Sequence, residues 1–175
     1  PEVFKGKNHQ RVFDIAAGVG VVGKRIQDGS AAEVICNDLC PKCLADMGRA
    51  GLKTVSFNID DDSRPYPLES GQFNAVVALA TIEHLLNLDY FLDEIKRILQ
   101  DDGRLYLSAP NYSGLTYLLP FLLTGKTFHD PLSKEDRYEF YAHVRYFTYR
   151  SLLDVVHQHG FAAANPAINI QPFGR

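Results

Sequence analysis

Apolar residues occur along this chain in short runs that are separated by polar, glycine-containing segments. Short runs that are mostly apolar have the length of buried strands, and segments with apolar residues three and four apart are typical of helices. The pattern predicts strands at residues 12–15, 33–36, 54–57, 75–79 and 105–108. It predicts helices at residues 20–27, 41–49, 88–100 and 148–159. A final strand is expected within residues 161–170.

The alternation of strands and helices indicates the fold class. Residues 75–79 are apolar throughout, as in a strand that is buried on both faces of a sheet. The helix at 88–100 carries one apolar stripe, formed by Leu88, Phe91, Leu92, Ile95, Ile98 and Leu99. We therefore predict an α/β protein with a Rossmann-like, doubly wound, mostly parallel sheet and helices on both faces. Ligands of such sheets bind at the carboxyl ends of the strands.

One segment, residues 112–147, does not follow this alternation. It is long, rich in aromatic residues and weakly periodic, and it stands where such folds have a short connection. We expect residues 1–175 to form a single domain, in which 112–147 are a lid-like insertion over an apolar substrate. The alternatives are a small extra helix packed on the core, a contact between two copies in a homodimer, and an interfacial anchor.

The charge and the ends of the chain narrow the class of partner. The chain has 175 residues and a formal net charge of −3, and it contains no run of Lys and Arg. Nucleic acid is therefore not an expected partner, because surfaces that bind it have a basic excess.

No apolar stretch approaches the roughly 20 residues that span a bilayer, so we predict no transmembrane segment and expect a cytoplasmic protein. The chain begins with Pro1 rather than Met, and we expect it to be truncated at both termini.

Three cysteines lie close together in the sequence, at Cys36, Cys40 and Cys43. A zinc site takes four ligands in tetrahedral geometry, and no further Cys or His lies nearby. An odd number of cysteines also argues against a disulfide framework. We expect three reduced thiols and predict no metal site.

A glycine-rich loop follows the first predicted strand. Gly18-Val19-Gly20-Val21-Val22-Gly23 has the spacing GxGxxG, and Asp38 comes about 20 residues later, as in a dinucleotide site. Asp14, just before the loop, is an awkward neighbour for a pyrophosphate and favours a ligand that carries positive charge. Asp14 could instead cap the amides of the loop. The glycine pattern alone leaves both kinds of cofactor open.

The residues around the loop resemble one family. Asp14-Ile15-Ala16-Ala17-Gly18-Val19-Gly20 resembles the first motif of class I S-adenosylmethionine-dependent methyltransferases. The likeness continues, in order, through residues 37–39, 67–74, 80–85, 97–105 and 109–111. Together these blocks are far more specific than the loop, and they resemble the small-molecule, ubiquinone-pathway-like methyltransferases. The chain departs from the family at Ala16, in place of the first glycine, and at Asn74, in place of an Asp.

The resemblance implies a fold, a cofactor and a reaction. The cofactor would be S-adenosyl-L-methionine, and the reaction methyl transfer to a small-molecule acceptor, with oxygen as the expected acceptor atom. The residues expected around the methionine moiety are Asp14, Ala16, Ala17, Gly18 and Gly20. Those expected along the ribose, the adenine and the transferring methyl group are Asp38, Leu39, Asn58, Ile59, Asp60, Ala80 and Thr81.

The acceptor side of the site is predicted from polar residues in and before the insertion. His84 and His143 are the candidate general bases, although each could serve the scaffold alone. Tyr112, His129 and Arg145 are the candidate substrate contacts.

Two other functions are kept as alternatives. They are a non-catalytic cofactor-binding or scaffold module, and a dehydrogenase-like domain that binds NAD through the glycine loop and Asp38.

Overall fold

The computed structural model describes residues 7–126, 129–134 and 137–163. By their contacts, the described residues group into two compact units. Residues 7–81 and 87–108 form one unit, which we call the sheet unit. Residues 82–86 and the described residues from 109 onward form the other, which we call the second unit. The prediction that the whole chain is one domain stays a prediction, and each unit is described by itself.

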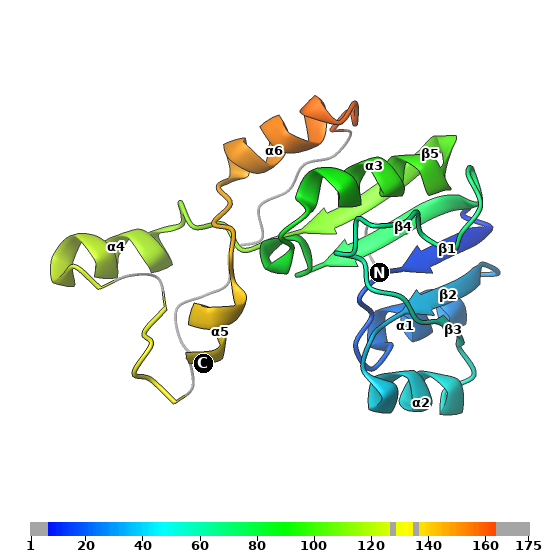
Figure 1. The fold of residues 1–175 in the computed structure, drawn as a ribbon, viewed down its shortest axis with the longest axis horizontal. Coiled ribbons are helices and arrows are strands. Elements are labelled where there is room, and N and C mark those ends of the chain that lie inside the picture. Colours follow the sequence, from blue (N-terminus) through cyan, green and yellow to red (C-terminus); the bar gives the residue numbers. More distant parts are fainter. Residues whose placement is uncertain (1–6, 127–128, 135–136, 164–175) are drawn as a thin grey trace. The chain divides into compact units, whose positions relative to one another are not determined.

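The sheet unit is built on a five-stranded sheet in the order β3-β2-β1-β4-β5 (Figure 1). Its strands are β1 (Arg11–Asp14), β2 (Glu33–Asn37), β3 (Lys53–Val55), β4 (Phe73–Leu79) and β5 (Leu99–Ser108). Every pair of neighbouring strands is parallel. The sequence order reverses between β1 and β4, which is the switch point where such sheets bind ligands. The predicted parallel sheet is therefore confirmed.

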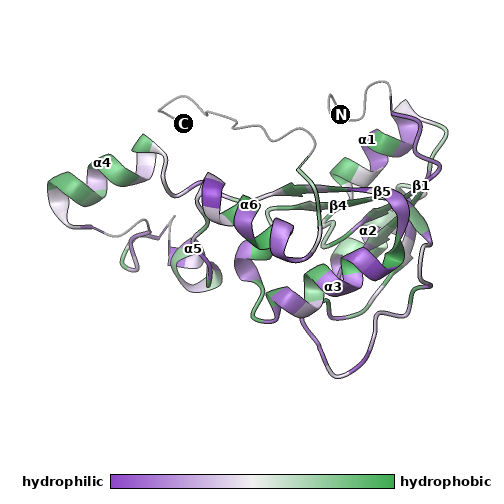
Figure 2. Cartoon of the chain, turned by 90° about the horizontal axis from the view of Figure 1, so that it is seen from above, coloured by the Kyte–Doolittle hydropathy of each residue, from purple (hydrophilic) through white to green (hydrophobic). Residues whose placement is uncertain are grey.

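Three helices cover the sheet: α1 (Val21–Gly29), α2 (Pro41–Arg49) and α3 (Leu88–Ile98). Right-handed crossovers place α1 and α2 on one face and α3 on the other, and Figure 2 shows α1 and α3 on opposite sides of the strands. Ile26 of α1 and Met47 of α2 belong to the same buried cluster as Val12 and Val77. The neighbouring residue Phe13 points to the opposite face, where its ring stacks on another aromatic ring, that of Phe73.

The third helix ends earlier than the apolar pattern predicts. Residues 99–100 were expected in the helix, but α3 ends at Ile98 and Leu99 opens β5, opposite Phe73. The register then shifts, because Ala75 pairs with Arg104. Such a bulge leaves the extra residues of β5 outside the regular pairing. The prediction failed because Leu99 continues the apolar stripe of the helix, although its backbone is extended.

The second unit contains a short 3-10 helix, η2 (Ile82–His84), and three α-helices. These are α4 (Leu115–Thr124), α5 (Arg137–Ala142) and α6 (Tyr149–Gln158). The predicted last helix is confirmed as α6, which begins with a capping box between Thr148 and Ser151. The lid-like role of 112–147 stays a prediction. Residues 161–163 are not in a strand, and the rest of the predicted final strand, 164–170, lies outside the described residues.

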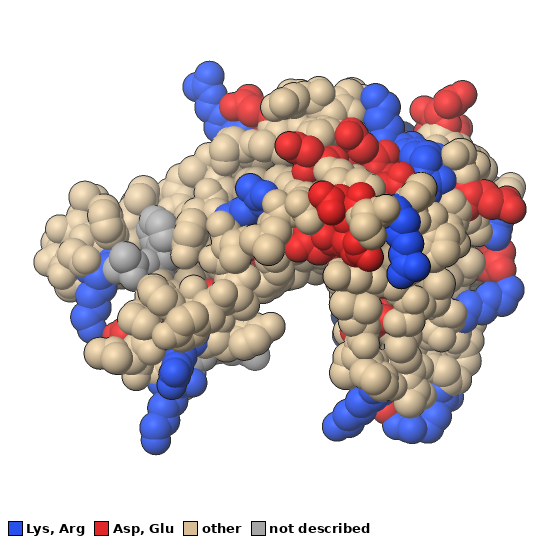
Figure 3. Space-filling view, in the orientation of Figure 1, with Lys and Arg blue, Asp and Glu red and all other residues tan. Residues whose placement is uncertain are grey.

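Within the described ranges, no helix has the length and apolar composition that crossing a membrane requires. On the face drawn in Figure 3, acidic side chains gather in one group whereas Lys and Arg are scattered. This distribution agrees with the slightly negative net charge of the chain.

Candidate functional site

The loop after β1 is held by main-chain hydrogen bonds to both neighbouring strands. The amide of Ile15 donates to the carbonyl of Val77 at 2.9 Å, and the amide of Ala17 donates to the carbonyl of Asn37 at 2.8 Å. The loop therefore lies at the carboxyl edge of the sheet, between the ends of β2 and β4. These two backbone bonds fix the start of the loop on the sheet.

The glycines of the loop serve different purposes. A Cβ atom at Gly20 would lie 2.5 Å from Cγ of Met47, and one at Gly23 would lie 2.6 Å from Sγ of Cys36. These two glycines let α1 pack closely against the sheet and α2. A Cβ at Gly18 would meet no atom within 4 Å, and the backbone there has a φ of +57°. Gly18 therefore borders open space, in a conformation that favours glycine, as expected where a backbone approaches a ligand.

Asp14, at the end of β1, is almost completely buried, with 3% of its surface exposed. Its carboxylate accepts a hydrogen bond from the amide of Gly23, whereas its Oδ2 atom has no hydrogen-bond partner among the described residues. Burial raises the pKa of Asp14 to about 6. The sheet edge thus contains an acidic group whose charged form would gain from a nearby cation.

Asp38 connects the loop to the following helix. Its Oδ2 accepts the amide hydrogen of Gly18 at 2.8 Å, and its Oδ1 accepts that of Cys40 at 2.8 Å. A carboxylate has about four lone-pair positions, so Asp38 can accept further bonds from ribose hydroxyls. Three apolar side chains at the ends of strands or in the loops after them are exposed to solvent: Val19, Leu39 and Leu79. They provide an apolar surface that an adenosine group could cover.

The residues after β3 are held against the start of α3. Asp60 Oδ1 accepts the amide hydrogen of Asn87 at 2.7 Å, and the carbonyl of Asp60 accepts a hydrogen bond from the Asn87 side chain at 2.7 Å. The carbonyl of Ile59 accepts the hydroxyl of Tyr66 at 2.7 Å. Asn58 is exposed. Asp60 and Ile59 therefore help to fix the loop, and Asn58 is the residue of the three that solvent reaches most.

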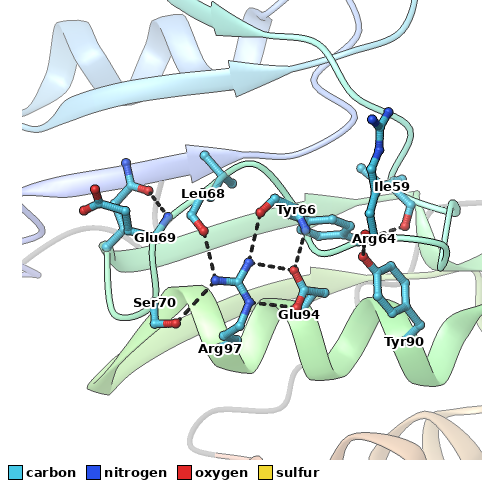
Figure 4. Close-up of polar contacts among 10 residues, drawn as sticks. Ile59, Arg64, Tyr66, Leu68, Glu69, Ser70, Tyr90, Glu94 and Arg97 are labelled. Atoms are coloured by element: carbon cyan, nitrogen blue, oxygen red, sulfur yellow. Dashed lines mark hydrogen bonds and ion pairs between the residues drawn. The ribbon is translucent and has the colours of Figure 1, made fainter.

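An ion pair on α3 fixes the rest of this connection (Figure 4). Arg97 donates from Nε and Nη2 to the two carboxylate oxygens of Glu94, each at 2.7 Å. The same guanidinium donates to the carbonyls of Tyr66 and Leu68, at 3.2 and 2.9 Å. The amide of Tyr66 in turn donates to Glu94 at 2.7 Å. This forked pair holds the loop between β3 and β4, and with it the predicted adenine contacts, on the helix.

The last predicted cofactor residues follow β4. Ala80 is exposed and has a φ of +50°, and its amide donates to the carbonyl of Ser108 at 3.2 Å. Thr81 is buried, and its hydroxyl donates to the carbonyl of Leu79 at 3.1 Å. All the residues that the resemblance assigns to the cofactor thus lie in the sheet unit, at the ends of its strands or in the loops that follow them. Their contact with a cofactor stays a prediction.

In the second unit, a buried tyrosine joins two histidines. The hydroxyl of Tyr112 lies 2.6 Å from Nδ1 of His143 and 3.0 Å from Nε2 of His129. On its other side, Nε2 of His143 lies 2.7 Å from a carboxylate oxygen of Glu139. Tyr112, His129 and His143 are each at most 8% exposed. Three of the predicted acceptor-side residues are therefore brought together by one hydrogen-bonded chain.

The candidate base His84 lies beside this chain. Its Nδ1 is 2.9 Å from the carbonyl of Ala142, and its ring centroid is 4.7 Å from that of His143. Glu83 precedes it and is 1% exposed, and burial raises the pKa of its carboxyl group. The sequence prediction missed Glu83 and Glu139. The spacing of Glu139 four residues before His143 on a helix was a signal that could have found the latter.

Arg145, a predicted substrate contact, has structural partners. It donates to the carbonyl of Leu85 at 2.9 Å and to that of Leu86 at 2.6 Å. These bonds hold the segment after η2 against the residues between α5 and α6. Its role toward a substrate stays a prediction.

The parallel sheet, its switch point and the loop at Gly18 are the features of α/β domains whose ligands lie at the carboxyl ends of the strands. The family model described as "Methyltransferase domain" matches residues 2–164 of the chain. The chain therefore belongs to the methyltransferase domain family.

Two curated relatives are named for methyl transfer to oxygen. Over 104 residues the chain is 31% identical to the malonyl-[acyl-carrier protein] O-methyltransferase of Geobacter sulfurreducens, covering 57% of this chain and 38% of that protein. Over 124 residues it is 28% identical to the mitochondrial ubiquinone biosynthesis O-methyltransferase of Dictyostelium discoideum, covering 63% and 38%. The chain thus spans well under half the length of these relatives.

Solved structures show the same fold. A S-adenosylmethionine-dependent methyltransferase from Archaeoglobus fulgidus matches with a TM-score of 0.67 at 19% identity, covering 91% of this chain and 63% of that one. The likeness confirms the predicted Rossmann-like architecture.

Proposed function

We propose that this chain binds S-adenosyl-L-methionine and transfers its methyl group to an oxygen atom of a small-molecule acceptor. The observation that carries the proposal is the open space at Gly18, whose amide is held by the carboxylate of Asp38, in the loop that follows Asp14. Both curated relatives are named as O-methyltransferases, which supports oxygen as the acceptor atom.

The residues at the sheet edge match the chemical parts of this cofactor. The backbone at Ala16, Ala17, Gly18 and Gly20 would pass along the methionine moiety, and Asp14 would provide negative charge for its ammonium and sulfonium groups. Asp38 would accept hydrogen bonds from the ribose hydroxyls, and Leu39 would lie on the adenine. Asn58, Ile59 and Asp60 would border the adenine, and Ala80 and Thr81 the methyl-bearing end. When bound, the cofactor supplies an electrophilic methyl group on sulfur.

The acceptor side is proposed to lie in the second unit. An acceptor hydroxyl has to lose its proton, and a base with a free lone pair can take it. His84 fits this role: its Nδ1 faces the carbonyl of Ala142, which can only accept, so its Nε2 carries the lone pair. His143 is the other candidate, with Glu139 orienting its ring. Tyr112, His129 and Arg145 would contact the acceptor.

Three further predictions belong to this proposal. The insertion at 112–147 would cover an apolar acceptor, and it would also be the place of a homodimer contact. The location would be the cytoplasm. Exposed apolar side chains on α4, among them Leu115, Leu122 and Leu123, support the idea that this helix covers an apolar molecule.

Isothermal titration with S-adenosylmethionine and with its demethylated product tests the cofactor. The decisive variant is Gly18→Ala, and Gly51→Ala is its matched control. Both glycines have a positive φ and open space around them, but Gly51 follows α2, away from the strand ends. We expect Gly18→Ala to weaken binding at least tenfold and Gly51→Ala to leave the affinity unchanged.

Equal affinities of the two variants would contradict the site. Tight binding of NAD, with no binding of S-adenosylmethionine, would contradict the function and favour the dehydrogenase-like alternative. Cofactor binding without methyl transfer to any acceptor in a panel of hydroxyl compounds would favour a non-catalytic module.

A further inference from the structure

Two cysteines lie together at the start of α2. Cys40 caps the helix, Pro41 begins it, and Cys43 follows in the first turn. Cys40 is exposed and Cys43 is half-buried, and the thiol of Cys43 donates a hydrogen bond to the sulfur of Cys40. We propose that Cys40 and Cys43 are a redox-active pair, which a low-molecular-weight disulfide converts into an internal disulfide bond beside the proposed cofactor site.

The spacing and the place of the pair fit this chemistry. Residues 40–43 have the spacing CxxC, within a strand–helix–strand unit formed by β2, α2 and β3. That spacing in such a unit is typical of thiol–disulfide chemistry. Paired cysteines also occur in zinc sites, but these take four ligands. Among the described residues, no third metal-binding side chain groups with Cys40 and Cys43, so redox chemistry is the use that fits.

Hydrogen bonds at the helix start give the two sulfurs different roles. The amides of Cys43 and Lys42 donate to the sulfur of Cys40. Together with the Cys43 thiol, these donors lower the pKa of Cys40, because they stabilise its thiolate. Donation to Cys40 raises the pKa of Cys43. The third cysteine, Cys36, is buried, and burial raises its pKa to about 12, so it takes no part.

The reaction has two exchange steps. In the first, the Cys40 thiolate attacks one sulfur of the small disulfide, forms a mixed disulfide and releases one small thiolate. In the second, the Cys43 sulfur attacks the Cys40 sulfur, the bond between Cys40 and the small molecule breaks, and the proton of Cys43 goes to the departing thiolate. The chain loses two electrons, and the small disulfide is reduced to two thiols.

The pair is joined to the proposed cofactor site through Asp38. The amides of Cys40 and Gly18 donate to the two carboxylate oxygens of Asp38, each at 2.8 Å. A disulfide brings its two sulfurs from hydrogen-bond contact to about 2.0 Å, so Cys40 has to shift. Because its amide shifts with it, oxidation should move Asp38 and weaken the binding of a ligand that Asp38 holds. This link rests on the proposed function, whereas formation of the disulfide does not.

The test is equilibration of the chain with oxidised glutathione, without cofactor, followed by thiol counting and disulfide mapping by mass spectrometry. We expect the unchanged chain to lose two of its three thiols, in one bond between Cys40 and Cys43. Cys43→Ser should stop at the mixed disulfide of Cys40 with glutathione. Cys40→Ser should react at least about tenfold more slowly, because the activated thiolate is gone. Cys36→Ala is the control and should form the disulfide as the unchanged chain does.

The pH dependence of alkylation separates an activated pair from two ordinary thiols. In the unchanged chain, labelling of Cys40 should have its midpoint below the value of about 8.5 of a free thiol, and labelling of Cys43 above it. Equal midpoints would overturn the proposal. So would three remaining thiols after equilibration, or a disulfide that contains Cys36 or joins two chains. Circular dichroism checks that each variant is folded, and the labelling itself needs no variant.

Calorimetry with S-adenosylmethionine on the reduced and the oxidised chain tests the link to the cofactor. We expect the oxidised chain to bind at least about fivefold more weakly, the lower end of ordinary coupling between sites. Equal affinities would overturn the link through Asp38. A chain that forms the disulfide but binds no cofactor in either state overturns the proposed function and leaves the redox pair standing.

Discussion

The sheet edge and the second unit hold their polar groups in opposite ways. At the sheet edge, main-chain bonds place the loop, as when the amide of Ala17 donates to the carbonyl of Asn37. In the second unit, side chains bond to one another, and Tyr112 joins residues that lie 17 and 31 positions away. The loop after β1 is therefore determined by a short stretch of sequence. The cluster of Tyr112, His129 and His143 depends instead on the folding of the whole second unit.

The difference teaches where a substitution should act. In the loop, a change should act through backbone conformation and close packing. In the cluster, it should act through the loss of buried hydrogen bonds. The predictions below test this contrast, from the largest expected effect on stability to the smallest.

Gly20→Ala should have the largest effect. The new Cβ would lie 2.5 Å from Met47 and 2.8 Å from Leu52, at a backbone φ of +80°. Overpacking costs about 1–3 kcal/mol, and the left-handed conformation about 1–2 kcal/mol more, so we expect a loss of about 3–4 kcal/mol. Urea denaturation measures it. Gly51→Ala, with a φ of +77° and open space, should lose the conformational part alone. Equal losses in the two variants would show that packing at Gly20 is unimportant.

Asp14→Asn should change the dependence of stability on pH. Burial raises the pKa of Asp14 from 3.8 to about 6, so the folded state holds this proton more tightly than the unfolded state. The group therefore lowers stability as pH rises from about 4 to 6, and the loss persists above that range. We expect Asp14→Asn to be more stable than the unchanged chain at pH 8, by about 2–3 kcal/mol, with little difference at pH 3.

Thermal unfolding at several pH values measures the effect of Asp14→Asn, and the exposed Asp62→Asn serves as the control. If Asp14→Asn differed in stability from the unchanged chain by the same amount at pH 3 and pH 8, the effect would come from packing and not from the charge of Asp14. The same variant should bind S-adenosylmethionine more weakly, since the proposed site loses its negative charge. The loop would then gain stability at the expense of binding.

Tyr112→Phe tests the cluster. It removes the hydroxyl that bonds to His129 and His143 but keeps the ring. Leaving buried polar groups without this partner should cost about 1–3 kcal/mol. Tyr141→Phe, at a tyrosine that is 65% exposed, should be close to neutral. A Tyr112→Phe variant as stable as Tyr141→Phe would show that the hydrogen-bonded chain does not hold the second unit together.

The contrast also explains what the sequence could predict. The strands and the loop after β1 could be predicted because a short apolar run indicates a strand, and the residues directly after that run form the loop. The end of α3 was missed because Leu99 suits both the helix stripe and the start of β5. Glu83 was missed because the side chains near it in the fold, such as that of His143, lie far away in sequence. Within the insertion, a helix was expected only as an alternative and without bounds, because the apolar residues of α4 have no clear period and it contains Pro120.

Ala16→Gly is the smallest expected change and bears most directly on the family resemblance. Ala16 stands where the family has a glycine, and its backbone has a φ of +53°. A non-glycine residue in this conformation costs about 1–2 kcal/mol. Replacing it by glycine removes that cost, but glycine also loses more conformational entropy on folding, which offsets part of the gain in stability. We therefore expect Ala16→Gly to stabilise the chain by about 0.5–1 kcal/mol.

A melting curve measures this gain, which would raise Tm by about 1–4 °C for a chain of this size. Ala31→Gly is the matched control, because Ala31 is exposed and does not have a positive φ. It should be neutral or slightly destabilising. The removed methyl group also borders the proposed path of the methionine moiety, so Ala16→Gly should bind S-adenosylmethionine at least as tightly as the unchanged chain. Weaker binding by this variant would mean that the methyl group of Ala16 contacts the cofactor, and that the departure from the family contributes to the site.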